Sequence, residues 1–156
     1  MTKALDLFFE PGSQTYLLRG DKDAVYEMLS THTSAKNFTM TPFLFERLAI
    51  DDVRLIKQEA NLLEGSEHER IIYIGATDIG VEAEQALLKL FEEPPQGTKV
   101  LFVTQKTKLL DTTLSRVTDL GAFSRRLQQK SKLLPLSPVE RLAYIQKLTK
   151  ESDDPD

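Results

Sequence analysis

Residues 70–104, RIIYIGATDIGVEAEQALLKLFEEPPQGTKVLFVT, predict a strand, a helix and a second strand in succession. The run at 71–74 is continuously apolar, as is typical of a parallel strand that is buried on both faces. Residues 82–91 place their apolar side chains at helical spacing, and residues 99–104 are again mostly apolar. Pro94 and Pro95 end the helix, because proline lacks an amide hydrogen and disfavours helix in the preceding residue. The stretch therefore predicts one β-α-β unit.

The rest of the chain continues the same alternation of strands and helices. Further strands are predicted at residues 15–19, 37–41 and 117–123. Further helices are predicted after Asp21 or Asp23, at residues 50–60, at residues 110–114 and after Ser137. The order β-α-β-α-β-α-β-α-β predicts an α/β fold, in which a doubly wound, parallel, five-stranded sheet is flanked by helices.

The composition is that of a globular protein of one domain. The chain has 156 residues, with 24 acidic and 20 basic side chains and a net charge of −4. A nucleic-acid-binding domain normally has a basic footprint, so a stand-alone role of this kind is not indicated. Basic residues do gather in the second half of the chain, and direct contact with DNA is therefore left open.

The sequence contains no cysteine, which excludes disulfides and thiolate zinc sites. The first twelve residues lack the apolar core of a signal peptide, and no apolar run approaches the ~20 residues that a membrane span requires. We therefore expect a cytoplasmic protein that does not contact the membrane.

The turn after the first predicted strand is where a nucleotide-binding P-loop would lie. A P-loop has the spacing G-x-x-x-x-G-K-[ST], because its amides surround the phosphates, its lysine contacts them and its hydroxyl binds magnesium. Counted from Gly20, the last three positions are Val25, Tyr26 and Glu27, and none matches. Lys22 is a cation close by, and we expect it to be a solvated residue at the helix start. The sequence predicts no cofactor bound in cis.

Metal chemistry is not indicated either. Gly75 and Ala76 follow the strand at 71–74, where a magnesium-binding Asp-Glu pair would be needed. Asp78 is expected to cap the next helix. His32 and His68 are isolated in polar surroundings, so surface roles are expected for both.

Glu92 and Glu93 stand at a helix end, where the helix dipole favours basic side chains. Because they are adjacent, they cannot converge on one substrate atom as an acid/base pair does. Two interpretations remain, namely solvated rim residues or an acidic edge that faces a partner. With no catalytic residue expected in cis and no metal site, the chain is predicted not to be an enzyme by itself.

Two blocks of sequence follow one another on neighbouring predicted elements. Residues 86–95, ALLKLFEEPP, are similar to the pattern L-L-K-x-L-E-E-P-P, and residues 108–117, KLLDTTLSRV, fit K-L-x-x-T-x-x-S-R-[CV]. Upstream, residues 50–56, IDDVRLI, are similar to V-D-D-I-R-x-L. Together these blocks resemble the AAA+ domain of bacterial DNA polymerase III clamp-loader subunits. The resemblance is strong over residues 70–117 and implies a P-loop NTPase fold of the AAA+ type.

The resemblance implies roles for three residues. In that family the Ser-Arg element supplies an arginine finger to ATP that a neighbouring subunit holds, and Ser115 and Arg116 stand at the matching positions. A guanidinium placed in trans neutralises charge that develops on the transferred phosphoryl group. Thr104 stands at the sensor position. The alternative for Arg116 is a structural salt bridge at the end of a short helix.

A missing P-loop with a retained Ser-Arg pair is similar to the delta-prime type of subunit. The resemblance implies a non-hydrolysing subunit of the DNA replication machinery. Its partners would be other clamp-loader subunits or a replication protein, including a neighbouring ATP site in trans. It also implies an α/β domain over residues 1–134 and the start of a helical lid, with an acidic tail, over residues 135–156. The alternative is a free-standing adaptor or regulatory domain that kept the fold and lost nucleotide binding and loader function.

Overall fold

A computed structural model describes residues 8, 14–35, 38–62 and 69–123 of the chain. Within these residues strands and helices alternate. They are β1 (Thr15–Arg19), α2 (Lys22–Ala35), β2 (Thr39–Leu48), α3 (Ile50–Leu62), β3 (Arg70–Ile79), α4 (Val81–Glu92), β4 (Thr98–Thr104), α5 (Asp111–Leu114) and β5 (Thr118–Ala122). All pairings between these strands are parallel, and the strand order is β2-β3-β4-β1-β5. The predicted five-stranded parallel α/β fold is confirmed.

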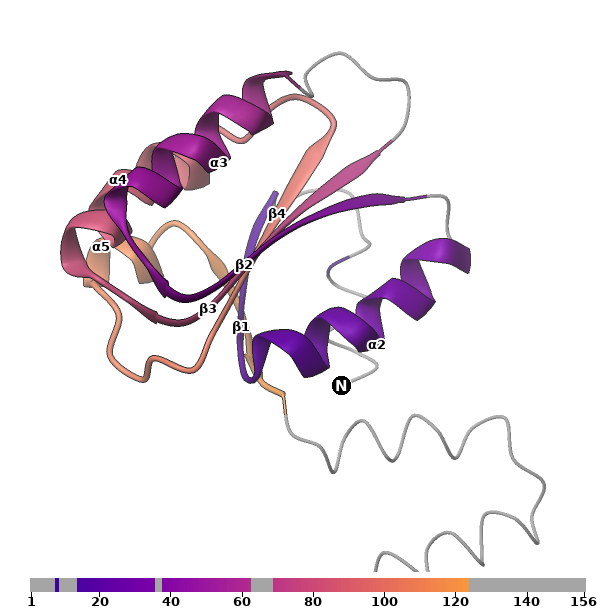
Figure 1. Cartoon of the computed structure of the whole chain (residues 1–156), viewed down its shortest axis with the longest axis horizontal. Coiled ribbons are helices and arrows are strands. Elements are labelled where there is room, and N and C mark those ends of the chain that lie inside the picture. The colour runs from indigo at the N-terminus through magenta and orange to yellow at the C-terminus, as the bar shows by residue number, and fades with distance from the viewer. Residues whose placement is uncertain (1–7, 9–13, 36–37, 63–68, 124–156) are drawn as a thin grey trace, which may run out of the picture. The chain divides into compact units, whose positions relative to one another are not determined.

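The helices cover the sheet on both faces, with α2 on one face and α3, α4 and α5 on the other (Figure 1). Side chains alternate between the two faces along each strand, so each strand contributes to two cores. Leu17, Ile72, Ile74, Val100 and Phe102 pack with α3 and α4. Tyr16, Leu18, Ile71, Tyr73, Leu101 and Val103 pack with α2.

The connections after β1 and β4 leave the sheet toward opposite faces, since β1 leads into α2 and β4 leads toward α5. β1 and β4 are neighbours in the sheet. Their carboxyl ends therefore form the topological switch point, which is where ligands bind in open α/β sheets.

Two strands are longer than predicted. The second strand was predicted at 37–41, but β2 continues to Leu48 through Pro42. β2 is an edge strand of the sheet, where proline is tolerated because one side of the strand has no ladder partner. β3 continues past Gly75 to Ile79, so the prediction that Asp78 caps a helix is wrong. The N-cap of α4 is Gly80, which makes no side-chain cap.

The helix boundaries agree closely with the sequence. In α3, Val53, Ile56 and Ala60 are buried, as their spacing predicted. α4 ends at Glu92, immediately before Glu93 and the proline pair. The chain then turns through Gly97, which has a φ of +73°, a conformation that favours glycine.

Several predictions fall on residues outside the described part of the chain. They concern His68, the helix after Ser137 and the acidic tail, and the division at residue 134 stays a prediction. Among the helices of the described residues, none combines the length and the apolar character needed to cross a bilayer.

Candidate functional site

The turn at the switch point is short. Only Gly20 and Asp21 separate the end of β1 from the start of α2. The amide of Gly20 donates to the carbonyl of Thr104 at 3.0 Å, which ties the turn to β4. A Cβ at Gly20 would lie 3.1 Å from Cβ of Phe123, so the turn is also tightly packed. A P-loop needs several more residues here to pass around a phosphate.

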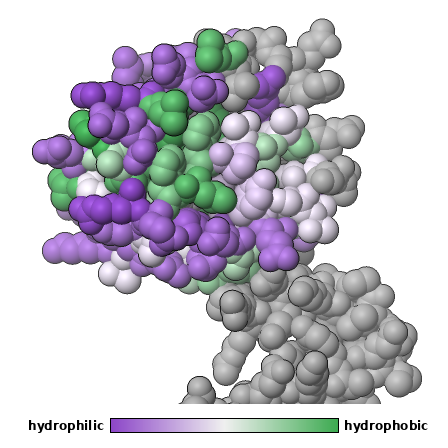
Figure 2. Space-filling model, viewed as in Figure 1, coloured by the Kyte–Doolittle hydropathy of each residue, from purple (hydrophilic) through white to green (hydrophobic). Residues whose placement is uncertain are grey.

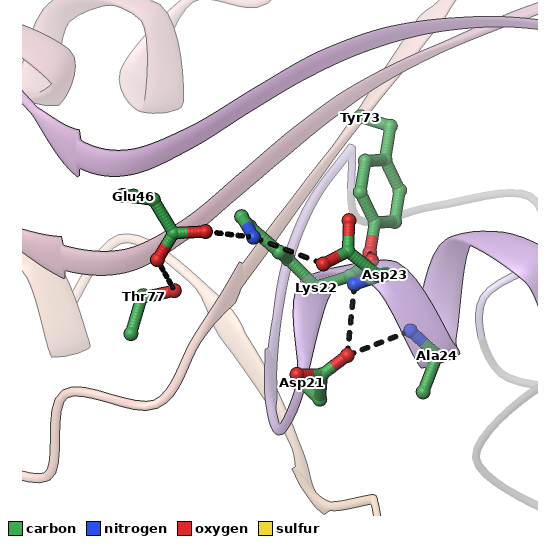
Figure 3. Close-up of polar contacts among 7 residues, drawn as sticks. All are labelled: Asp21, Lys22, Asp23, Ala24, Glu46, Tyr73 and Thr77. Atoms are coloured by element: carbon green, nitrogen blue, oxygen red, sulfur yellow. Dashed lines mark hydrogen bonds and ion pairs between the residues drawn. The ribbon is translucent and has the colours of Figure 1, made fainter.

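The N-terminus of α2 is occupied by a carboxylate from its own chain. Asp21 Oδ1 accepts hydrogen bonds from the amides of Asp23, at 3.1 Å, and Ala24, at 2.8 Å (Figure 3). The amides of a helix N-terminus are the groups that bind phosphate in nucleotide sites. Asp21 and Asp23 were both possible caps of this helix, and the structure uses Asp21, which satisfies two of these amides internally.

Lys22 is buried, with an exposed fraction of 7%, so the prediction of a solvated lysine is wrong. Its Nζ donates to Glu46 Oε1 at 2.8 Å and to Asp23 Oδ2 at 3.0 Å (Figure 3). Thr77 Oγ1 donates to the other oxygen of Glu46 at 3.1 Å. The hydroxyl of Tyr73 donates to the carbonyl of Lys22 at 2.5 Å. The one buried cation of this turn is thus engaged by two carboxylates.

The contacts between these groups shift their pKa values. Hydrogen bonds to Glu46 and then Asp23 raise the pKa of Lys22 above its ordinary 10.5. Hydrogen bonds from Lys22 and then Thr77 lower the pKa of Glu46 below 4.5. Burial is the main cause that raises the pKa of the Tyr73 hydroxyl. Lys22 is therefore a charged structural group at neutral pH and not a nucleophile or base.

Thr104, the predicted sensor residue, is the last residue of β4 and is fully buried. Its Oγ1 accepts a hydrogen bond from the amide of Lys106 at 3.1 Å. Its carbonyl accepts the hydrogen bond from Gly20. Thr104 therefore lies at the switch point and connects the turn to the segment that leads to α5.

Arg116 lies just after α5 and is held by three hydrogen bonds. Its Nε donates to Glu92 Oε1, and its Nη1 donates to the carbonyl of Thr112, at 2.8 Å, and to Ser115 Oγ, at 3.3 Å. Ser115 Oγ in turn donates to the carbonyl of Thr112 at 2.9 Å. Nη2 makes no hydrogen bond or ion pair to any residue that the structure describes. The salt bridge weighed as an alternative for Arg116 is present, and its partner is Glu92.

Arg116 and the β1–α2 turn lie at opposite ends of β1. Thr15, the first residue of β1, donates from Oγ1 to the carbonyl of Phe91, next to Glu92. At the other end of β1, Arg19 is paired with Thr104. Four steps of a strand span about 13 Å. The structure therefore does not bring Arg116 together with Thr104, and Arg116 is remote from its own switch point.

The two glutamates at the end of α4 have different surroundings. Glu92 binds Arg116, whereas Glu93 is exposed and lines an open groove of about 430 Å³ together with Lys57, Lys89 and Pro94. Glu92 therefore has a partner within its own chain, which neither sequence interpretation (a solvated rim residue or an acidic edge that faces another protein) had predicted.

Sequence reasoning missed Glu84, which is buried on α4 and accepts a hydrogen bond from the amide of Leu110 at 2.6 Å. A signal was available, because Glu84 stands three residues before Leu87 and seven before Phe91, on the same helical face. Its partner could not be predicted, since the two residues are 26 positions apart.

Groups of three or more His, Asp or Glu residues that could hold a metal ion do not occur within the described ranges. His32 is exposed at the end of α2, with its Nδ1 beside the carbonyl of Met28 at 3.0 Å. This position agrees with the predicted surface role.

Comparison with solved structures supports the class of fold. The chain is similar to a DNA polymerase III, gamma subunit-related protein from Thermotoga maritima, with a TM-score of 0.61 and 20% sequence identity. The match covers 93% of this chain and 53% of that protein, so this chain spans about half of its length. At this identity the likeness establishes the fold alone: the domain is an α/β domain with a five-stranded parallel sheet flanked by helices.

Comparison of the sequence with known protein families identifies the family of the chain. Residues 21–123 match the family described as DNA polymerase III, delta subunit, and this match covers more than half of the chain. The chain belongs to this family. No curated protein matches the sequence.

Proposed function

We propose that this chain is a non-hydrolysing, delta-prime-like subunit of a clamp loader in DNA replication. It acts through contacts with other subunits and presents Arg116 to ATP that a neighbouring subunit holds. The observation that carries the proposal is the geometry of Arg116. Three hydrogen bonds fix its guanidinium, Nη2 keeps its donors unengaged by the described residues, and the group lies at the end of β1 away from its own turn.

The turn at the switch point supports the absence of nucleotide binding in cis. It has two residues, Asp21 fills the amides that a phosphate would use, and Lys22 is engaged by Glu46 and Asp23. We expect calorimetric titration of the chain with ATP and magnesium to give no binding heat. Submicromolar binding would contradict this part of the proposal.

The chemistry of Arg116 suits a role in trans. A guanidinium offers five N–H donors in a planar fork, and a phosphate can accept two of them. A phosphate can bind at Nη2 while Nη1 keeps its hydrogen bonds to Thr112 and Ser115, so the side chain need not change its conformation. In the free chain, Glu92 offsets part of the positive charge of the Arg116 guanidinium. A phosphoryl group carries more negative charge than Glu92 and competes with it for the guanidinium. Ser115 is a positioning residue, because it bonds both Arg116 and the carbonyl of Thr112.

The surface of the domain suits protein contacts. Figure 2 shows apolar residues exposed among hydrophilic ones on the side where α3, α4 and α5 lie. Leu62 and Leu55 on α3 are 74% and 48% exposed, and Val81 on α4 is 52% exposed. These exposed apolar side chains on neighbouring helices are available for contact with another protein.

The test is single-turnover ATP hydrolysis by the reconstituted clamp-loader complex. With Arg116→Ala we expect the neighbouring site to slow by about 10³-fold, the lower end of the effect of arginine fingers. Arg116→Lys is expected to rescue little, because an ammonium lacks the planar fork. Arg54→Ala is the matched control, since Arg54 is also a surface arginine and, among the residues that the structure describes, bonds only Asp51 on its own helix. If hydrolysis is unchanged while the complex assembles, the adaptor alternative is favoured instead.

A further inference from the structure

α4 carries a carboxylate inside the core of the domain. Glu84 stands in the first turn of α4, and its side chain has an exposed fraction of 1%. Glutamate is almost never fully buried unless it is paired, because removal of its charge from water is costly. Its burial next to Leu87 and Phe91 therefore needs a specific partner.

The partners of Glu84 all belong to the segment between β4 and α5. Oε1 accepts the amide of Leu110 at 2.6 Å, and Oε2 lies 3.8 Å from Nζ of Lys106. Lys106 is itself fixed, because its Nζ donates to the carbonyl of Ile79 at 2.8 Å and its amide donates to Thr104. One carboxylate thus contacts both ends of this segment, with a hydrogen bond at Leu110 and an ion pair at Lys106. Between these ends, Leu109 is buried in the core and the carbonyl of Thr107 accepts a hydrogen bond from Arg19.

Leu110 is the N-cap residue of α5 and has an apolar side chain that cannot cap a helix. In a capping box, a glutamate within the same helix accepts the backbone amide of the N-cap residue. Here Glu84 accepts that amide from a different helix, α4. Glu84 therefore supplies from α4 an acceptor that the sequence of α5 lacks.

The start of α5 is separated from Arg116 by a single helical turn. α5 has four residues, and the backbone bonds that follow it are local: Ser115 donates to Asp111, and Arg116 donates to Thr113. Because the backbone from Leu110 to Arg116 is bonded as one helical turn, a displacement of the backbone at Leu110 would also displace Arg116. At the far end, the contact with Glu92 completes the attachment of the segment to α4.

We propose that Glu84 is the positioning residue for Arg116. It fixes the segment from Lys106 to Leu110 and the start of α5, so that Ser115 and Arg116 are presented as a rigid unit. The link to ATP hydrolysis rests on the proposed function of Arg116, whereas the positioning itself does not.

The first experiment measures hydrogen exchange of amides 110–116 in the full chain. Glu84→Met keeps the volume and removes the acceptor, and we expect exchange in this segment to rise about tenfold, as the loss of a hydrogen bond to a charged group implies. Glu84→Gln keeps an acceptor for Leu110 and should give a smaller rise. Glu82→Met is the control, because Glu82 is exposed on the same turn. An equal rise in β1 and β4, or no rise at 110–116, would overturn the proposal.

The second experiment repeats the ATPase measurement in the complex. Glu84→Met should lower hydrolysis toward the level of Arg116→Ala, and the double variant should be no slower than Arg116→Ala alone. A further loss in the double variant would contradict positioning through Arg116. If Arg116→Ala has no effect while exchange at 110–116 still rises, the arginine finger fails and the positioning by Glu84 stands.

Discussion

Arg116 and Glu92 are joined by a hydrogen bond between Nε and Oε1, although 24 residues separate them in the sequence. The bond connects the end of α4 to the second residue after α5. It also connects the two blocks of sequence that carry the family resemblance, since one block contains Glu92 and the other contains Arg116. These blocks therefore form one structural unit, in which the end of α4 contacts Arg116 of the Ser-Arg pair.

The contact between Arg116 and Glu92 is expected to contribute little to stability. The two side chains are 30% and 47% exposed, and surface ion pairs contribute about 0–1 kcal/mol. Glu92→Gln should therefore lower the midpoint of thermal unfolding by no more than about 4 °C. A loss of several kcal/mol would instead show that Arg116 is retained as a structural residue, which would weaken the role in trans.

Replacement of Gly75 in β3 is predicted to destabilise the domain. A Cβ there would lie 2.8 Å from Cβ of Lys22 and 2.9 Å from Cδ2 of Leu44. Gly75→Ala should cost about 1–3 kcal/mol in the free energy of unfolding, as over-packing does. Gly80→Ser is the matched comparison, because its nearest neighbour is the end of the Arg47 side chain at 3.6 Å. Serine is also a good N-cap, so urea unfolding should show no loss for that variant.

The hydrogen bond from Thr15 to Phe91 is expected to stabilise the junction of β1 and α4. Thr15 is 3% exposed, and its Oγ1 donates at 3.0 Å. Thr15→Val keeps the shape of the side chain but removes the hydroxyl donor, so the carbonyl of Phe91 loses this hydrogen bond. The loss should lower the free energy of unfolding by about 1–3 kcal/mol. Thr39→Val, at an exposed position of β2, is the control and should be near neutral. Equal effects of the two variants in chemical unfolding would contradict a specific role for this bond.

The elements that could be predicted from sequence were those whose signals are local. The apolar runs of β1 and β4 and the helical spacing of α4 depend on burial alone, and their predicted bounds agree with the structure to within a residue. The proline pair after α4 acted as expected, because the geometry of proline does not depend on tertiary contacts.

The predictions that failed depended on residues distant in sequence. The strand was predicted to end before Gly75, but β3 continues through Gly75, which is a point of close approach for Lys22 and Leu44. Lys22 was expected in solvent, since nothing local indicates that Glu46 lies 24 residues further on to receive it. For the candidate site, Ser115 and Arg116 could be selected from the motif, but the support from Glu92 and Glu84 could not. Those contacts arise only when α4 and α5 pack together.

The contact between Lys22 and Glu46 predicts how stability depends on pH. The folded pKa of Glu46 is lowered, so its stabilising effect is present above the ordinary value of 4.5 and is lost as the pH falls through the folded pKa. The folded pKa of Lys22 is raised, so its effect is present below 10.5 and is lost as the pH rises through the folded value. The contact should therefore stabilise the domain between these limits. We expect wild type to exceed Glu46→Gln in the free energy of unfolding at pH 7, and the difference to disappear in acid once Glu46 is protonated. Urea unfolding of both proteins across this range measures the difference directly, and a difference that does not change with pH would show that Glu46 acts through packing and not through its charge.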